Sequence, residues 1–486
     1  MKAGLFLLCF SVFLAAAPRA PFVGAAEAEV ATARALAERG SPDLAPDAPS
    51  ALSPFTTVHR GRQLALTGPL AALTLVPAEL ATLGAMRLVP HLDRARLAET
   101  LESATSALWA ALVCLLFCAD LEKLGARRSW AVGATLLLAG STALFISARV
   151  PDGSALAALL LLLAMRGARG ESLGAAFGCG LAAGALALVD AAYLPAAIVL
   201  AIGAALRRRS LGRALAIFFA LAVGGVLLLM QRASLGAPIP VPGDFVDGMY
   251  GLLLSTGKSV FLYSPPLALA LFALPWWWRR RRSDAALLVA VAVALVLAVA
   301  ASPRWDGDPA WGPRRLFLLV PLLVEPVALW LADLQARGRV RGWLRVALLA
   351  VAVNGVVVQA LGAALPPKSY LDIVDKVRVA TGAPGWFAAP RSECHFIPQF
   401  SPLTGHVWLL SHLLRGDRDL GHDAPWMLLQ ENNPKLSAEA ARLRLDWAPL
   451  GWPRAQAALW LGLYALVALG SGWFVRRRLR PPRVIR

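Results

Sequence analysis

Two carboxylates stand close together in a polar stretch near the start of the chain. The stretch GAAEAEVATARALAERGSPDL covers residues 24–44 and begins with Glu27 and Glu29, followed by Arg34. A carboxylate in such a stretch can act as a general base that deprotonates an acceptor hydroxyl or amine. The helix dipole also favours acidic residues at a helix N-terminus, so a purely structural role stays open. The residue types alone do not choose between Glu27 and Glu29.

A third carboxylate, Asp152, lies in the sequence SARVPDGSA at residues 147–155. Pro-Asp-Gly is a strong turn sequence by itself, which would explain Asp152 without any function. The alternative is that Asp152 joins the carboxylates of residues 24–44 in one site. We therefore keep Asp152 with Glu27 and Glu29 as candidate catalytic residues.

Two later stretches carry basic residues suited to phosphate. The stretch at 302–315, SPRWDGDPAWGPRR, contains Arg304, Arg314 and Arg315. A guanidinium group binds phosphate through two parallel hydrogen bonds, so these arginines are candidate phosphate ligands. Its tryptophans have an ordinary explanation as residues of a membrane interface.

The second basic stretch, GDFVDGMYGLLLSTGKSVFLYSPP at 243–266, contains Lys258 within the triplet GKS. A nucleotide-binding phosphate loop needs a glycine five residues before Gly257, and that position is Leu252. Lys258 can still meet a phosphate as a point charge, or lie at a membrane interface with its ammonium group in water.

The chain that carries these residues is strongly apolar. It has 486 residues, of which 58% are hydrophobic and only 16% charged, and its mean hydropathy is +0.61. Soluble domains are about 25% charged, and runs such as 285–301 and 316–332 approach the roughly 20 residues that cross a bilayer. The sequence thus predicts a multi-pass protein of the lipid bilayer. The net charge of +18 is spread in short clusters between apolar runs, which excludes a nucleic-acid-binding surface.

The basic clusters predict how the chain crosses the membrane. They lie at 123–128, 207–213, 279–282, 337–342 and 476–486, and cytoplasmic loops are rich in Lys and Arg. Apolar runs occur near 4–17, 65–86, 104–121, 129–147, 154–166, 172–189, 191–206, 212–232, 264–278, 284–302, 315–333, 344–363 and 456–475. All the clusters lie inside only if one early run does not cross.

The run 65–86 is the best candidate for this exception, because it carries Pro69, Pro77 and Glu79. We therefore expect an all-α fold with about 12 transmembrane helices, both ends inside, and interfacial or re-entrant helices in the first outer loop. The N-terminal run is either a secretory signal or an uncleaved first span, and we expect the latter.

The same topology predicts three regions of the chain. Residues 1–363 form a membrane core whose first outer loop is 18–103, residues 364–455 form an extracytoplasmic loop or lid, and residues 456–486 form the last span and a basic tail. The other outer segments are 148–153, 233–263 and 303–314.

No metal or cofactor site is expected. Cys114 and Cys118 are four residues apart without a His or carboxylate that would complete a metal set. The histidines at 395, 406 and 412 match no metal-binding motif. Glu325 stands alone in the run 315–333, where it either has a function or pairs with an arginine.

Five stretches, in this order along most of the chain, are similar to a known group of proteins. They are ATARALAERGSPDL, SARVPDGSALAALLLLLA, YGLLLSTGKSVFLYSPPLALALFALP, AWGPRRLFLLVPLL and FIPQFSPLTGHVWLL. The chain resembles the GT-C-type membrane glycosyltransferases of bacteria, relatives of protein O-mannosyltransferases and of lipid A aminoarabinose transferases. The family usually has adjacent Asp and Glu in the first loop, where this chain has AAEAEV, and often Arg where this chain has Asp190.

The resemblance implies a GT-C-like fold in a bacterial inner membrane, with an active site that faces outside. It implies transfer of a hexosyl or pentosyl group from a polyprenyl-phosphate donor to a lipid, glycan or protein acceptor of the cell envelope. Glu27 or Glu29 would deprotonate the acceptor, and Arg314, Arg315 and Lys258 would bind the phosphate. A polytopic transporter or flippase, or a catalytically degenerate protein of the same fold, are the alternatives.

Overall fold

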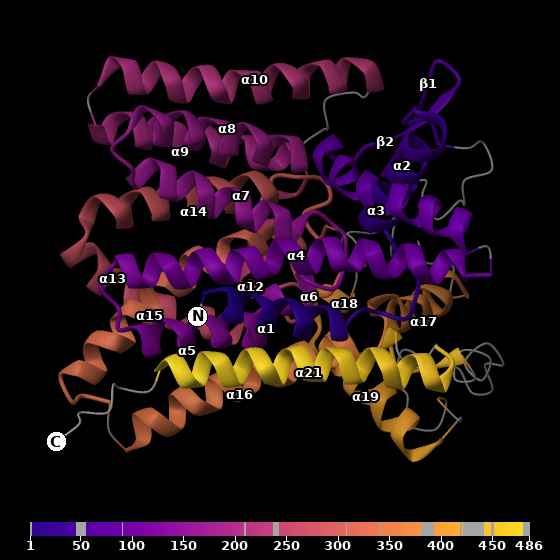
Figure 1. Cartoon of the computed structure of the whole chain (residues 1–486). Coiled ribbons are helices and arrows are strands. Elements are labelled where there is room, and N and C mark those ends of the chain that lie inside the picture. Colours follow the sequence, from indigo (N-terminus) through magenta and orange to yellow (C-terminus); the bar gives the residue numbers. More distant parts are fainter. Residues whose placement is uncertain are drawn as a thin grey trace.

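The computed structural model describes residues 2–44, 55–89, 91–208, 210–236, 243–307, 309–340, 342–380, 393–417, 420, 442–448 and 452–479. Much of the predicted lid at 364–455 and the tail beyond Leu479 lie outside these residues. The described chain is a bundle of helices that run roughly side by side, with a single antiparallel hairpin of β1 (Thr56–His59) and β2 (Arg62–Ala65) at one end (Figure 1). The predicted all-α membrane fold is confirmed in outline, and this hairpin is an addition to it.

Seven helices of the described chain are long and apolar enough to cross a membrane. They are α3 (Pro69–Leu88), α4 (Arg94–Lys123), α10 (Leu211–Leu235), α14 (Arg282–Ala300), α15 (Val320–Ala336) with the 3-10 turn before it, α16 (Trp343–Ala364) and α21 (Arg454–Leu479). The other helices are α1 (Lys2–Ala15), α2 (Ala25–Arg39), α5 (Arg128–Ser141), α6 (Leu144–Ser147), α7 (Ser154–Arg169), α8 (Leu173–Val189), α9 (Leu194–Arg208), α11 (Phe245–Leu253), α12 (Val260–Tyr263), α13 (Ala270–Arg280), α17 (Pro367–Ala380), α18 (Glu393–Phe396) and α19 (Pro402–Arg415).

The count of about 12 spans stays a prediction, because several predicted runs are interrupted. The run 129–147 is divided at Thr142, whose backbone is extended between α5 and α6. The run 264–278 begins as a 3-10 helix at Pro265 before it continues as α13. Proline and extended residues end regular helical hydrogen bonding, and hydropathy alone does not register such breaks.

The run 65–86 forms the single continuous helix α3, although Pro77 lies inside it. Its length and composition would allow it to cross a membrane. In Figure 1 it lies beside α2, at the end of the bundle that carries the hairpin. That α3 lies at the membrane interface instead of crossing the membrane therefore stays a prediction.

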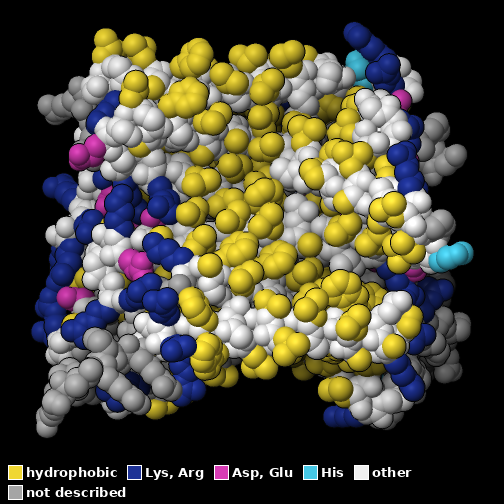
Figure 2. Space-filling model, viewed as in Figure 1, with side chains coloured by type: hydrophobic (Ala, Val, Ile, Leu, Met, Phe, Trp, Pro, Cys, Tyr) yellow, Lys and Arg dark blue, Asp and Glu magenta, His cyan; other side chains and the backbone are white. Residues whose placement is uncertain are grey.

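The loops that we predict to be cytoplasmic meet at one end of the bundle, which we call the basic end. In Figure 2, hydrophobic side chains cover the middle of the visible face, and Lys and Arg gather most densely along its left edge. Direct ion pairs join the loops there: Lys2 and Arg128 with Glu122, Arg207 with Asp284, and Arg280 and Arg337 with Asp333.

The predicted outer segments meet at the opposite end, which we call the site end. Arg149, in the turn before α7, donates hydrogen bonds to the carbonyl oxygens of Ala16, Ala363 and Asp446. It also forms an ion pair with the Asp446 carboxylate at 3.5 Å, and both side chains are about 3% exposed. One guanidinium group thus joins the end of α1, the end of α16 and the segment 442–448.

Glu325 forms a bidentate ion pair with Arg169, with N–O distances of 2.6 and 3.0 Å. Of the two roles open for this residue, pairing with an arginine is the one observed. The two parallel hydrogen bonds between the guanidinium group and the carboxylate let both charges compensate each other inside the bundle.

Candidate active site

A cavity of about 340 Å³ lies at the site end, between α2, the hairpin and the loop 301–307. Its charged lining consists of Glu29, Asp190, Arg232, Arg304, Arg314 and Arg315. Four arginines against two carboxylates give this lining a net formal charge of +2. Three of the four predicted phosphate ligands and one of the three predicted catalytic residues are thus brought together.

Glu29 reaches the cavity from α2, whose alanine-rich sequence allows it to pack closely. Ala25, Ala28 and Ala33 are fully buried, and α2 packs against α3. Glu29 itself is only 2% exposed. A Cβ atom at Gly153 would lie 3.7 Å from Glu29 Oε2, so the carboxylate lies against the turn that precedes α7.

Gly153 combines a left-handed backbone with close packing, and we expect alanine there to be costly. Its φ is +72°, and a Cβ would lie 2.9 Å from Val189 Cγ1 and 3.1 Å from Ala71 Cβ. Gly40, with φ +66° and nothing within 4 Å of its Cβ position, is the matched control. Gly40→Ala should cost about 1 kcal/mol from backbone strain alone. Gly153→Ala should cost about 2–4 kcal/mol, because overpacking adds to that strain.

Thermal unfolding of the two purified variants in detergent measures this difference. Equal losses of stability in Gly153→Ala and Gly40→Ala would show that the turn before α7 has room to relax.

Arg314 and Arg315 follow each other in a 3-10 helix and are held from different sides. Arg314 is 5% exposed, and its Nη1 donates to the carbonyl oxygen of Asp152 at 3.3 Å. Arg315 Nε lies 3.0 Å from Asp190 Oδ2. Arg315 Nη1 donates to Ser302 Oγ at 3.1 Å and to the Arg304 carbonyl oxygen at 3.0 Å. These contacts fix both guanidinium groups at the cavity wall.

Asp190 orients Arg315 from the junction of α8 with the next helical turn. Its Oδ1 accepts a hydrogen bond from Ala192 N at 3.0 Å. Burial alone would raise the pKa of Asp190, but Arg315 and Arg314 hold this pKa below its usual value. Asp190 is therefore a carboxylate that neutralises part of the arginine charge.

The other two arginines reach the cavity from the loop 301–307 and from α10. Arg304 lies with its Cζ 5.3 Å from the ring centre of Phe55, a cation–π distance. Arg232, at the end of α10, was not among the predicted residues. The signal that would have found it is the one used for residues 304–315, a basic residue at the outer end of an apolar run.

Glu27 and Asp152 lie outside the lining of this cavity. Glu27 is half-buried in the first turn of α2; burial raises its pKa, and Lys368 opposes that rise. Asp152 Oδ1 accepts a hydrogen bond from Ser154 N at 3.0 Å, at the start of α7. Asp152 also lines a smaller neighbouring cavity of about 70 Å³ together with Lys368.

Lys258, the remaining predicted phosphate ligand, is 1% exposed and also lies outside the lining. Its Nζ donates to the carbonyl oxygens of Ala310 at 3.0 Å and Gly312 at 3.2 Å. Lys258 thus braces the loop between Arg304 and Arg314. Asp306 in this loop faces His395 of α18 at 3.6 Å, which connects the loop to the segment 393–417.

Searches against protein-family models and against curated proteins find no match. Three solved structures are similar to the chain. ArnT from Cupriavidus metallidurans bound to undecaprenyl phosphate has a TM-score of 0.45 at 15% identity, over 98% of this chain and 77% of that chain. The Archaeoglobus fulgidus oligosaccharyltransferase in complex with Zn and sulfate has a TM-score of 0.45 at 12% identity, over 77% of this chain and 55% of that chain.

The third is the archaeal oligosaccharyltransferase AglB from Archaeoglobus fulgidus in complex with an inhibitory peptide and a dolichol-phosphate. Its TM-score is 0.42 at 13% identity, over 78% of this chain and 58% of that chain. Each of the three similarities covers at least 77% of this chain. TM-scores below 0.5 specify neither activity nor substrates.

Proposed function

We propose that the chain is a membrane glycosyltransferase that moves a sugar from a polyprenyl-phosphate donor to an acceptor outside the cytoplasm. The observation that carries this proposal is the cavity in which a buried glutamate faces four arginines, at one end of a membrane-spanning bundle. In this orientation the basic end faces the cytoplasm, as the distribution of Lys and Arg favours.

The charge of the cavity suits the leaving group better than the donor. A sugar linked to polyprenyl phosphate is a phosphodiester with one negative charge, and the released polyprenyl phosphate is a monoester that approaches two. The lining carries a net +2. Electrostatic stabilisation therefore grows as the bond to the sugar breaks, which lowers the barrier rather than only strengthening donor binding.

In the proposed reaction, Glu29 takes the proton from the acceptor hydroxyl or amine. The freed oxygen or nitrogen attacks the anomeric carbon, and the bond between that carbon and the phosphate oxygen breaks. The bonding electrons leave with the phosphate, where Arg314, Arg315, Arg304 and Arg232 compensate the charge. Asp152 and Lys258 act indirectly, through the backbone contacts that hold Arg314 and the neighbouring loop.

A lipid-linked donor suits the location of the cavity. Arg232 ends α10, whose outward face carries exposed apolar side chains such as Phe219, Leu229 and Met230. An isoprenoid chain can follow that face through the membrane while its phosphate reaches the arginines. A soluble nucleotide sugar has no apolar chain that could bind to this face of α10.

The test is transfer by the purified chain in liposomes that contain a labelled polyprenyl-phosphate sugar and an envelope extract as acceptor. We expect a labelled covalent product and release of an equal amount of polyprenyl phosphate. Movement of the intact donor across the bilayer without product would favour a flippase. Donor binding without product or release, under conditions where related transferases turn over, would indicate a degenerate member.

A further inference from the structure

A second charged cavity lies at the basic end, opposite to the cavity that contains Glu29. Its volume is about 290 Å³, and α4, α7, α9 and the start of α14 surround it. Its basic side chains are Lys123, Arg166, Arg169, Arg207 and Arg281. It takes no part in the proposed reaction, because Arg169 and Arg207 lie at the ends of α7 and α9 opposite to the ends that begin beside Gly153 and Asp190.

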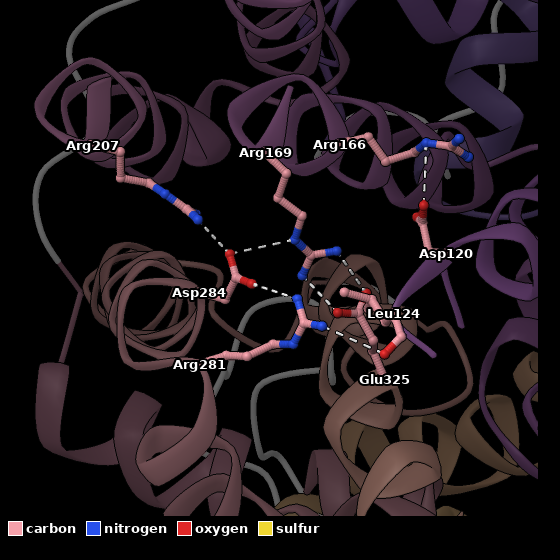
Figure 3. A network of polar contacts seen from close by, with 8 residues as sticks. All are labelled: Asp120, Leu124, Arg166, Arg169, Arg207, Arg281, Asp284 and Glu325. Atoms are coloured by element: carbon pink, nitrogen blue, oxygen red, sulfur yellow. Dashed lines mark hydrogen bonds and ion pairs between the residues drawn. The ribbon is translucent and has the colours of Figure 1, made fainter. Parts of the chain in front are cut away.

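Among the described residues, four of these five basic groups have a carboxylate partner, the weakest pair being that of Arg281, whose Nη1 lies 3.9 Å from Asp284 Oδ2. Arg207 Nη2 lies 2.6 Å from Asp284 Oδ1, and Arg166 Nε lies 3.3 Å from Asp120 Oδ1. Arg169 forms its bidentate pair with Glu325 beside them. Figure 3 shows Arg169, Arg207 and Arg281 around Asp284, and the Arg166–Asp120 pair to one side of them.

Positive charge nevertheless exceeds negative charge here. Five basic groups stand against the three carboxylates of Asp120, Asp284 and Glu325, so the net formal charge is +2. Arg166 Nη1 and Arg207 Nη1 are both shielded from solvent, and neither has a hydrogen-bond acceptor among the described residues. The excess lies on Lys123 and Arg281, which are exposed at the mouth of the cavity and so accessible to an incoming anion. Guanidinium edges with unused N–H groups are the donors that phosphate oxygens accept from.

We propose that this cavity binds a phosphate group, from either the headgroup of an anionic phospholipid or a free phosphate. About 290 Å³ exceeds by roughly tenfold the ~30 Å³ that one water occupies in the liquid, so the space suffices for a phosphate and its hydration. The cavity lies between helix ends next to basic loops, where pockets between membrane helices bind acidic headgroups. A phosphodiester headgroup would compensate one of the two excess charges, and a free phosphate up to two of them.

The test measures thermal unfolding of the full chain in phosphatidylcholine micelles, titrated separately with phosphatidylglycerol and with inorganic phosphate. A ligand that binds only the folded chain raises the midpoint, and the stabilisation grows as RT ln(1 + [L]/Kd). A rise with phosphatidylglycerol alone assigns the site to a lipid headgroup, and a rise with inorganic phosphate assigns it to the free anion. If neither ligand raises the midpoint of unfolding, the proposal is wrong, and these side chains form only a network of ion pairs.

Two double variants decide whether the rise comes from this cavity. Arg166→Gln with Arg207→Gln should weaken the apparent affinity by roughly tenfold or more. Arg476→Gln with Arg477→Gln removes the same charge from the end of α21, which packs against the start of α1 at the same end of the bundle. This control should keep the wild-type affinity. An equal loss in both would mean that general surface charge attracts the anion.

If the first double variant does not fold, Arg166→Lys with Arg207→Lys replaces it. Lysine keeps both charges but lacks the planar guanidinium group that donates two parallel hydrogen bonds, so weaker binding is again expected. Wild-type affinity in this lysine variant would contradict a site built on the two guanidinium groups.

Discussion

Glu29→Gln is expected to lower sugar transfer by about 10²–10⁴-fold, the usual contribution of a general base. Glutamine keeps the size of the side chain, so its place against Gly153 is preserved while proton acceptance is lost. Glu29 is 2% exposed and lines the arginine cavity, whereas Glu27 is half-buried near Lys368 and does not. Glu27→Gln should therefore keep transfer within a few-fold of the wild type.

The measurement is initial-rate transfer in proteoliposomes, together with binding of polyprenyl phosphate to the same preparations. Binding is expected to persist in Glu29→Gln, because this change removes a negative charge from the cavity. Full activity in Glu29→Gln with a large loss in Glu27→Gln would move the base to Glu27. Full activity in both would exclude the polar stretch of α2 from catalysis.

Arg232→Gln combined with Arg304→Gln is expected to weaken polyprenyl phosphate binding by roughly 100-fold or more. A hydrogen bond to a charged group contributes about 1.5–3 kcal/mol, and this variant removes two such donors. These arginines are the informative pair because Arg314 and Arg315 also hold backbone and Asp190 contacts, so their loss would disturb the cavity wall. Transfer should fall as well, since the leaving phosphate loses stabilisation.

The matched control is Arg60→Gln with Arg62→Gln, in the exposed turn of the hairpin beside the cavity. It removes the same charge from the same end of the molecule but no group from the lining. Equilibrium binding of labelled polyprenyl phosphate distinguishes the two pairs. Equally weakened binding in both double variants would mean that the site end attracts anions by its overall charge, without a defined phosphate site.

Much of the arrangement follows from the distribution of charge along the sequence. The positive-inside rule sorts the loops into two sets, and the structure brings each set together at its own end of the bundle. The arginines at 304, 314 and 315 break that rule, and all three line the cavity. Arg232 breaks it in the same way and was missed, because a single arginine after an apolar run looks like an ordinary helix end.

The choice between Glu27 and Glu29 shows where sequence reasoning stops. Residues two apart on an α-helix point about 200° apart, so only one of them can face a given cavity. Which one does so depends on the rotation of α2, and that is set by its contacts with α3 and Gly153. The roles of Lys258 and Asp190 likewise depend on partners more than 50 residues away in the chain.

Arg149 gives the site end an order of assembly. Its guanidinium group needs the backbone of Asp446 as well as that of Ala16, two segments at opposite ends of the polypeptide. During synthesis the early helices enter the membrane long before residue 446 has left the ribosome. The segment that follows α1 therefore cannot be held by Arg149 and Asp446 together until nearly the whole chain has been made. A chain that ends before residue 446 would contain Glu29 and the four arginines of the cavity. It would lack the contact between Arg149 and Asp446 that holds the surrounding segments together.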